Sequence, residues 1–192
     1  MANKKYLIFS LILILLVVPA FGLGGEVYVA GVVYSENRND CLSVIEAIEV
    51  RDLTYNPSST QKVGETDENG LFLVDVKPLD EGYLLELRDP KGIYENANIH
   101  GDPTPKKQRK SKKLVSKQAV KEWDDKRVKQ EIERQVSRYS FIRNNFPYKT
   151  TWHQAIRRLV NENLGFLEGN LRPEIRKVVY RDISNARREI AK

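Results

Sequence analysis

The spacing of apolar positions changes near residue 116, and this change divides the chain into two kinds of structure. Before it, short runs alternate between apolar and polar residues, as half-buried strands do. After it, apolar residues recur every three to five positions, as on one face of a helix. The sequence therefore predicts an α+β protein, in which an N-terminal β region is followed by a C-terminal helical region.

Four runs in the N-terminal region predict strands. Glu26–Tyr34 is rich in Val and Tyr and apolar on both faces, which favours a covered, central strand. Glu46–Leu53, Leu71–Val76 and Tyr83–Asp89 alternate, so each is expected to bury one face. Short strands with turn residues between them predict an antiparallel β-sandwich over residues 26–99.

Two turns are predicted from residue type. Asp67 and Asn69 precede Gly70, but the Gly comes too early for a calcium loop of the EF-hand type, so no metal site is predicted. Asn69-Gly70 favours a type I′ turn that joins two strands of a hairpin, with Asp67 capping the turn through its own backbone. Asp89-Pro90-Lys91-Gly92 has the residues of a type I turn.

Residues 116–192 predict a basic three-helix module. The first helix runs from about Ser116 to the Asn144–Pro147 segment. Its apolar stripe consists of Val120, Trp123, Val128, Ile132, Val136 and Tyr139. Charged residues fill the gaps in this stripe, so the helix is expected to be amphipathic.

Local signals bound the second and third helices. Thr151 and Gln154 have the spacing of a capping box, so the second helix is predicted to begin there. Gly165 and Gly169 are expected to break it. Pro173 suits the first turn of the third helix, because that turn tolerates a missing N–H.

The N-terminus predicts export. Two lysines precede Tyr6–Val18, in which only Ser10 is polar, and small residues follow. This is the pattern of a signal peptide over residues 1–22, with cleavage after Gly22 or, as the second choice, Gly24. The alternative is an uncleaved membrane anchor, because the apolar segment is just long enough to cross a thin bilayer.

The two regions carry opposite charge. Residues 23–105 contain six basic and sixteen acidic side chains, a net charge of −10, whereas residues 106–192 contain twenty-four basic and ten acidic side chains, a net charge of +14. Between them, residues 100–115 lack periodicity and are predicted to be a solvated basic linker.

The basic linker has two interpretations. In the first, its cations contact an anionic surface, which is a membrane leaflet or an envelope polymer. These cations are Lys106, Lys107, Arg109, Lys110, Lys112 and Lys113. In the second, the acidic and basic regions attract each other within one chain. Nucleic acid is a disfavoured partner, because an exported protein rarely meets it.

Catalytic chemistry finds little support in the sequence. His100 and His153 are the two histidines, and neither has a Cys or a second His at the spacing of a zinc site. No nucleophile elbow is present. Cys41, the single cysteine, is expected to be a buried thiol. We therefore predict a protein without catalytic residues, metal or cofactor.

Five aromatic residues surround the first helix–helix connection. They are Tyr139, Phe141, Phe146, Tyr148 and Trp152. The favoured interpretation is a small core under this corner, because aromatic side chains dominate small cores. The alternative is a contact surface for a sugar or a protein partner, with Tyr148 and Trp152 as the contact residues.

Residues 26–94 resemble the carboxypeptidase regulatory-like domain, a transthyretin-like β-sandwich with a fold like that of carbohydrate-binding modules. The resemblance rests on AGVVY, AIEVRDL, TDENGLF and YLLELRDPKG. After Gly92 the pattern is incomplete, because Ile93–Ile99 reads at most as an irregular last strand.

The resemblance implies an accessory module that is not catalytic. We therefore expect an exported binding or positioning protein of the cell envelope, with carbohydrate, an envelope polymer or a protein as partner. The alternative is a membrane-anchored protein whose basic helical module binds an anionic partner or surface.

Overall fold

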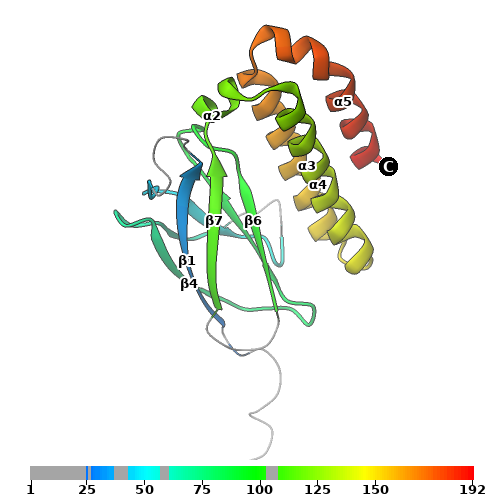
Figure 1. The fold of residues 1–192 in the computed structure, drawn as a ribbon. Helices are drawn as coiled ribbons and strands as arrows, with labels where there is room; N and C mark the ends of the chain where they lie inside the picture. The colour runs from blue at the N-terminus through cyan, green and yellow to red at the C-terminus, as the bar shows by residue number, and fades with distance from the viewer. Residues whose placement is uncertain (1–24, 26, 37–42, 57–60, 103–107) are drawn as a thin grey trace, which may run out of the picture.

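The computed structural model describes residues 25, 27–36, 43–56, 61–102 and 108–192. Within these residues the protein is a mixed α+β structure, in which seven strands in two sheets precede four helices (Figure 1). The predicted signal segment, Cys41, Lys106 and Lys107 lie outside the described residues. In the part of the chain that is described, no helix has both the length and the apolar character needed to cross a membrane.

The first sheet has the strand order β4-β1-β7. Its central strand β1 (Val27–Glu36) runs antiparallel to β4 (Leu71–Val76) and parallel to β7 (Gln108–Val115). The second sheet has the order β3-β2-β5-β6 and is antiparallel throughout. Its strands are β3 (Gln61–Glu65), β2 (Glu49–Asp52), β5 (Tyr83–Arg88) and β6 (Ala97–Gly101).

Apolar side chains from both sheets form one buried cluster. The central strand β1 contributes Val27, Val29 and Val33, and β5 contributes Tyr83, Leu85 and Leu87. Phe72, Val74 and Val76 on β4 are buried, as their alternation predicts. The predicted strands are thus confirmed with boundary shifts of a few residues, whereas β3 and β7 were not expected.

The turn after β3 differs from the predicted hairpin. Strands β3 and β4 belong to different sheets, so the Asp67–Gly70 turn connects the two sheets. Of the two central residues expected in a type I′ turn, only Gly70 has a positive φ, of 67°. The capping role of Asp67 is confirmed, because its Oδ1 accepts hydrogen bonds from the backbone N–H groups of Asn69 and Leu71, each at 2.9 Å.

The first predicted helix is two helices, α2 (Lys117–Glu122) and α3 (Asp125–Asn145). The break has a local cause, since Asp124 Oδ1 accepts a hydrogen bond from the Arg127 backbone N–H at 2.8 Å and caps the new helix. Helix α5 (Pro173–Ala191) begins at the predicted proline.

Helix α4 (Thr150–Asn170) corrects two expectations. It begins at Thr150 without a side-chain cap, so the predicted capping box is absent. It also continues through Gly165 and Gly169, which are expected helix breaks. A helical glycine costs only about 1 kcal/mol, and the buried face of α4, which includes Leu159 and Leu164, outweighs this cost.

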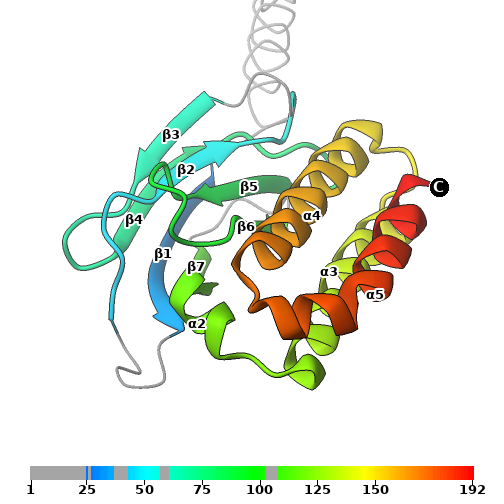
Figure 2. The same cartoon turned by 90° about the horizontal axis from the view of Figure 1, so that it is seen from above.

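The helices cover the second sheet. Helix α4 lies beside β5 and β6, and α5 lies on the side of α3 and α4 away from the sheets (Figure 2). Leu53, Leu84 and Val115 from the β region belong to the helical core. Four ion pairs also join the acidic β region to the basic helices. They are Glu36–Arg127, Glu95–Arg134, Glu81–Lys149 and Glu86–Arg158. The opposite charges of the two regions therefore meet within the chain.

Strand β7 overturns the predicted solvated linker. Gln108–Val115 pairs in parallel with β1 from Val29 to Glu36. The prediction failed because the strand is mostly polar, with Leu114 and Val115 as its only apolar residues. Its backbone hydrogen bonds and these two buried side chains are sufficient to hold it at the edge of the sheet.

Candidate functional site

A recess of about 360 Å³ lies where β6 and β7 meet α3. Its volume is within the range of small-molecule sites. Asn98 and His100 line it from one face of β6, because alternate residues of a strand share a face. Arg134 and Arg138 line it from α3, since residues four apart lie on one side of a helix. Lys112 reaches it from β7.

Three cations surround this recess, but only one of them is neutralised. Arg134 Nη2 lies 2.9 Å from Glu95 Oε1 and also pairs with Glu131. Among the described residues, neither Lys112 nor Arg138 forms an ion pair. Arg138 donates one hydrogen bond, from Nη1 to Gln135 Oε1 at 3.2 Å. The recess therefore carries two positive charges without a carboxylate partner.

The environment disfavours both of these charges. Burial, together with Arg138 and Arg134, lowers the pKa of Lys112 to about 8. Burial, together with Arg134, also lowers the pKa of Arg138. An anion that entered the recess would relieve this repulsion, because an opposite charge nearby stabilises the protonated form.

Three side-chain atoms on β6 have no hydrogen-bond partner among the described residues. Both amide atoms of Asn98, Nδ2 and Oδ1, are buried and unpaired, so either orientation of the amide leaves a donor and an acceptor free. Nε2 of His100 is also buried and unpaired. Burial lowers the pKa of His100, which favours the neutral ring at neutral pH. Buried polar groups usually have partners, so these atoms make the recess a candidate interaction site.

The remaining walls of the recess are apolar. Leu84 from β5, Ile142 from α3 and Ile156 from α4 line it and are buried. Phe141, which is 54% exposed, lines it as well. The site thus combines a cationic side with an apolar side, an arrangement that suits a ligand with an acid group and a hydrocarbon group.

A buried polar network lies beside the recess. Glu95 and Glu131 are buried around Arg134, and Gln135 donates to Glu131. Asn163 Nδ2 on α4 donates to Gln135 Oε1 at 3.2 Å. Burial and the neighbouring Glu131 raise the pKa of Glu95 to about 7, although Arg134 opposes this shift. The charge next to the recess therefore depends on pH near neutrality.

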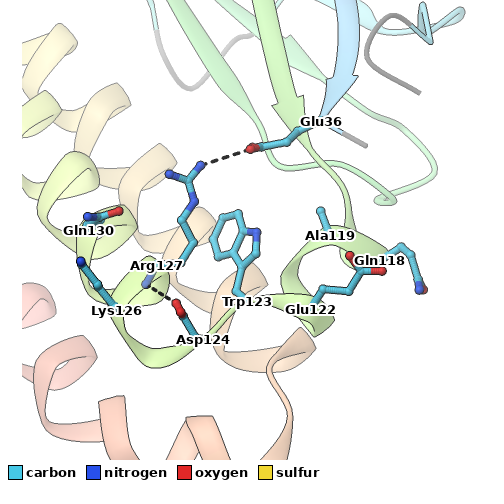
Figure 3. Close-up of a pocket in the computed structure, with 9 residues that line it drawn as sticks. All are labelled: Glu36, Gln118, Ala119, Glu122, Trp123, Asp124, Lys126, Arg127 and Gln130. Carbon is cyan, nitrogen blue, oxygen red and sulfur yellow. Dashed lines mark hydrogen bonds and ion pairs between the residues drawn. The ribbon is translucent and has the colours of Figure 1, made fainter. Parts of the chain in front are cut away.

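A second hollow lies at the α2–α3 corner (Figure 3). Arg127 extends over the Trp123 ring, with its guanidinium carbon 5.1 Å from the ring centre, and pairs with Glu36 at 3.2 Å. Trp123 is only 4% exposed, so its ring is not free to stack on a sugar. This corner joins β1 to the helices, and its arginine is already neutralised, unlike Lys112 and Arg138.

The structure separates the predicted cationic contacts. Lys113 is not among the residues that line the recess, and its Nζ lies 3.5 Å from Glu36 Oε1. Lys110 is partly buried, and Lys112 lines the recess. Arg109 belongs to β7, but its side chain is not described. Of the described basic side chains of β7, Lys112 lines the recess and Lys113 pairs with Glu36.

The two predicted aromatic contacts differ in solvent exposure. Trp152 is fully buried and donates from Nε1 to the Thr54 carbonyl oxygen at 3.3 Å, so its ring is not exposed for contact with a ligand. It packs near His100 and Phe146, which supports the interpretation of a core under the corner. Tyr148 is 93% exposed and remains a candidate contact.

Comparison of the sequence with protein-family models gives no match, and comparison with curated proteins gives none either. Within the described residues, no group of His, Cys, Asp and Glu side chains is arranged to hold a metal ion.

Proposed function

We propose that this protein is an exported, non-catalytic binding protein of the cell envelope, and that it holds an anionic ligand in the recess between β6, β7 and α3. The observation that carries this proposal is the pair Lys112 and Arg138. Both cations line a partly enclosed, partly apolar site without an ion-pair partner among the described residues. Partial burial of cations that have no ion-pair partner is unfavourable, so a bound anion would offset part of that cost.

The proposal includes a transthyretin-like sandwich as the scaffold of the site. Two sheets with a common buried cluster support this interpretation, as do the AGVVY and TDENGLF segments in the sequence. The helices complete the site, because α3 supplies Arg138 while the β region supplies Lys112 and Asn98. Neither part of the chain makes the recess alone.

A carbohydrate, the ligand implied by the resemblance, is less favoured than an acid with an apolar group. Trp123 and Trp152 are buried, so neither ring is open to stacking on a sugar, and Phe141 is the one exposed aromatic side chain among the residues that line the recess. An anionic partner was expected in the alternative interpretation, for the basic helical module. Here the anion is proposed to bind in the recess.

Isothermal titration with sodium hexanoate at low ionic strength tests the proposal. We expect saturable binding by the wild-type protein and at least tenfold weaker binding by Lys112→Gln and Arg138→Gln. Lys177→Gln, which removes an exposed cation on α5 outside the recess, is the matched control and should bind as the wild type does. Equal binding by all four proteins, or no binding by any, would contradict the proposal.

N-terminal sequencing of the mature protein tests the exported location. A start at Leu23 or Gly25 supports export with cleavage, whereas an intact Met1 supports the membrane-anchored alternative.

A further inference from the structure

The unpaired amide of Asn98 restricts which anion the recess accepts. Its Oδ1 needs a donor and its Nδ2 needs an acceptor, and neither atom has one among the residues that the structure describes. A simple fatty acid supplies only acceptors, so it would leave Oδ1 buried and unpaired. A buried unpaired polar atom costs about 1–3 kcal/mol. A ligand that carries a donor next to its acid group avoids this cost.

His100 lines the recess beside Asn98. It lies two residues after Asn98 and therefore on the same face of β6. Its Nε2 is buried without a partner, and its ring is held against Phe146 and Trp152 at centroid distances of 4.8 and 5.3 Å. This packing fixes the His100 ring beside Asn98 in the wall of the recess, so the ring limits the space around the Asn98 amide.

The apolar walls restrict the remainder of the ligand. Leu84, Ile142 and Ile156 are at most 4% exposed and provide a surface for a branched hydrocarbon group. A sugar acid has donors and a carboxylate, but it would place hydroxyl groups against these side chains without partners for them.

On the basis of the proposed function, we propose that the recess recognises an acyl amino acid unit: a carboxylate held by Lys112 and Arg138, an adjacent amide N–H facing Asn98, and an apolar side group against Leu84, Ile142 and Ile156. This chemistry occurs in a free N-acyl amino acid and at the C-terminal residue of a peptide. The two sources differ only in what precedes the amide.

A set of matched probes tests each part of this assignment. N-acetyl-leucine contains the carboxylate, the amide and the branched group. Relative to it, 4-methylpentanoate lacks the amide, N-acetyl-leucinamide lacks the charge, and glucuronate lacks both the amide and the apolar group. We expect N-acetyl-leucine to bind at least about tenfold more tightly than each of the three, because each loses at least one favourable interaction.

The variant Asn98→Ala tests the residue that carries the inference. It should bind N-acetyl-leucine and 4-methylpentanoate equally, while its thermal unfolding stays close to that of the wild type, because the removed amide has no partner to lose. Asn98→Asp, as a second variant, should weaken N-acetyl-leucine binding further by adding a negative charge beside the acid.

The outcomes separate this inference from the proposed function. If 4-methylpentanoate or glucuronate binds the wild type as tightly as N-acetyl-leucine does, the inference is overturned while anion binding stands. If none of the acids binds, the proposed function fails as well. The tripeptide acetyl-Ala-Ala-Leu distinguishes the sources: tighter binding than N-acetyl-leucine indicates a peptide C-terminus, and exclusion indicates a free acyl amino acid.

Discussion

Arg158 on α4 donates a hydrogen bond from Nη2 to Oε1 of Glu86 on β5 at 3.1 Å, and the glutamate side chain is completely buried. Burial raises the pKa of Glu86, and Arg158 opposes that shift. This contact belongs to the group of ion pairs that join the acidic β region to the basic helices. Its partners are 72 residues apart in the sequence, so it reports on the docking of the two regions.

Removal of Arg158 should weaken this docking. We expect Arg158→Ala to lower the free energy of unfolding by about 2 kcal/mol, because Glu86 then stays buried without its cation. The measurement is urea unfolding at neutral pH. Lys177→Ala, at an exposed position on α5, is the control and should change stability by less than about 0.5 kcal/mol.

The double variant Arg158→Ala/Glu86→Gln gives a second readout. It should regain part of the lost stability, since the uncompensated buried charge is gone. If the single variant costs no more than the control, the ion pair does not hold the regions together.

Stability should also depend on pH through Glu95. Its folded pKa of about 7 lies above the ordinary value of 4.5, so the folded state binds this proton more strongly than the unfolded state does. The resulting stabilisation is complete below about pH 4.5 and is lost as the pH rises through about 7. Glu95→Gln removes this dependence, because the amide does not titrate.

Urea unfolding at about pH 5 and about pH 8 measures the effect. The stability of the wild type relative to Glu95→Gln should fall between the two conditions, on the order of 2 kcal/mol. The subtraction cancels the other titrating groups, which both proteins share. A difference that is the same at both values would show that Glu95 titrates normally in the folded protein.

Replacement by alanine at two glycine positions should change the free energy of unfolding in opposite directions. At Gly31 on β1, a Cβ would lie 2.4 Å from Phe72 ring carbons and 2.8 Å from the Lys110 carbonyl oxygen. Gly31→Ala should therefore cost about 2 kcal/mol of unfolding free energy. At Gly165 on α4, a Cβ meets nothing within 4 Å, so Gly165→Ala should add about 0.5–1 kcal/mol.

Thermal unfolding of the two variants checks this pair of expectations. A loss of stability in Gly165→Ala would mean that the glycine is needed as a break, as the sequence interpretation expected.

Periodicity predicted the elements that bury one regular face. Strand β4 and helix α5 agree with their predicted extents because each carries an apolar stripe of the proper period. Strands β3 and β7 were not predicted, because they are mostly polar. The break between α2 and α3 depends on the N-cap at Asp124. It was not predicted, because the apolar stripe continues through the break and indicates a single helix.

The residues of the recess were harder to predict from the sequence than the fold was. Lys112 was recognised as a basic residue but was assigned to a surface contact in a linker. Asn98, His100 and Arg138 come from separate segments, and their proximity depends on how α3 packs on β6 and β7. The four-residue spacing of Arg134 and Arg138 was the one available signal, because it places both on one side of a helix.

The most direct test of the central claim is an NMR titration of the Lys112 side chain with and without saturating sodium hexanoate. In the free protein its pKa should be about 8, compared with the ordinary 10.5, and Arg138→Gln should raise it by removing a nearby cation. Hexanoate should raise the pKa by at least about one unit, because the bound anion favours the charged amine. A free pKa near 10.5, or one that hexanoate leaves unchanged, would contradict an anion site in this recess.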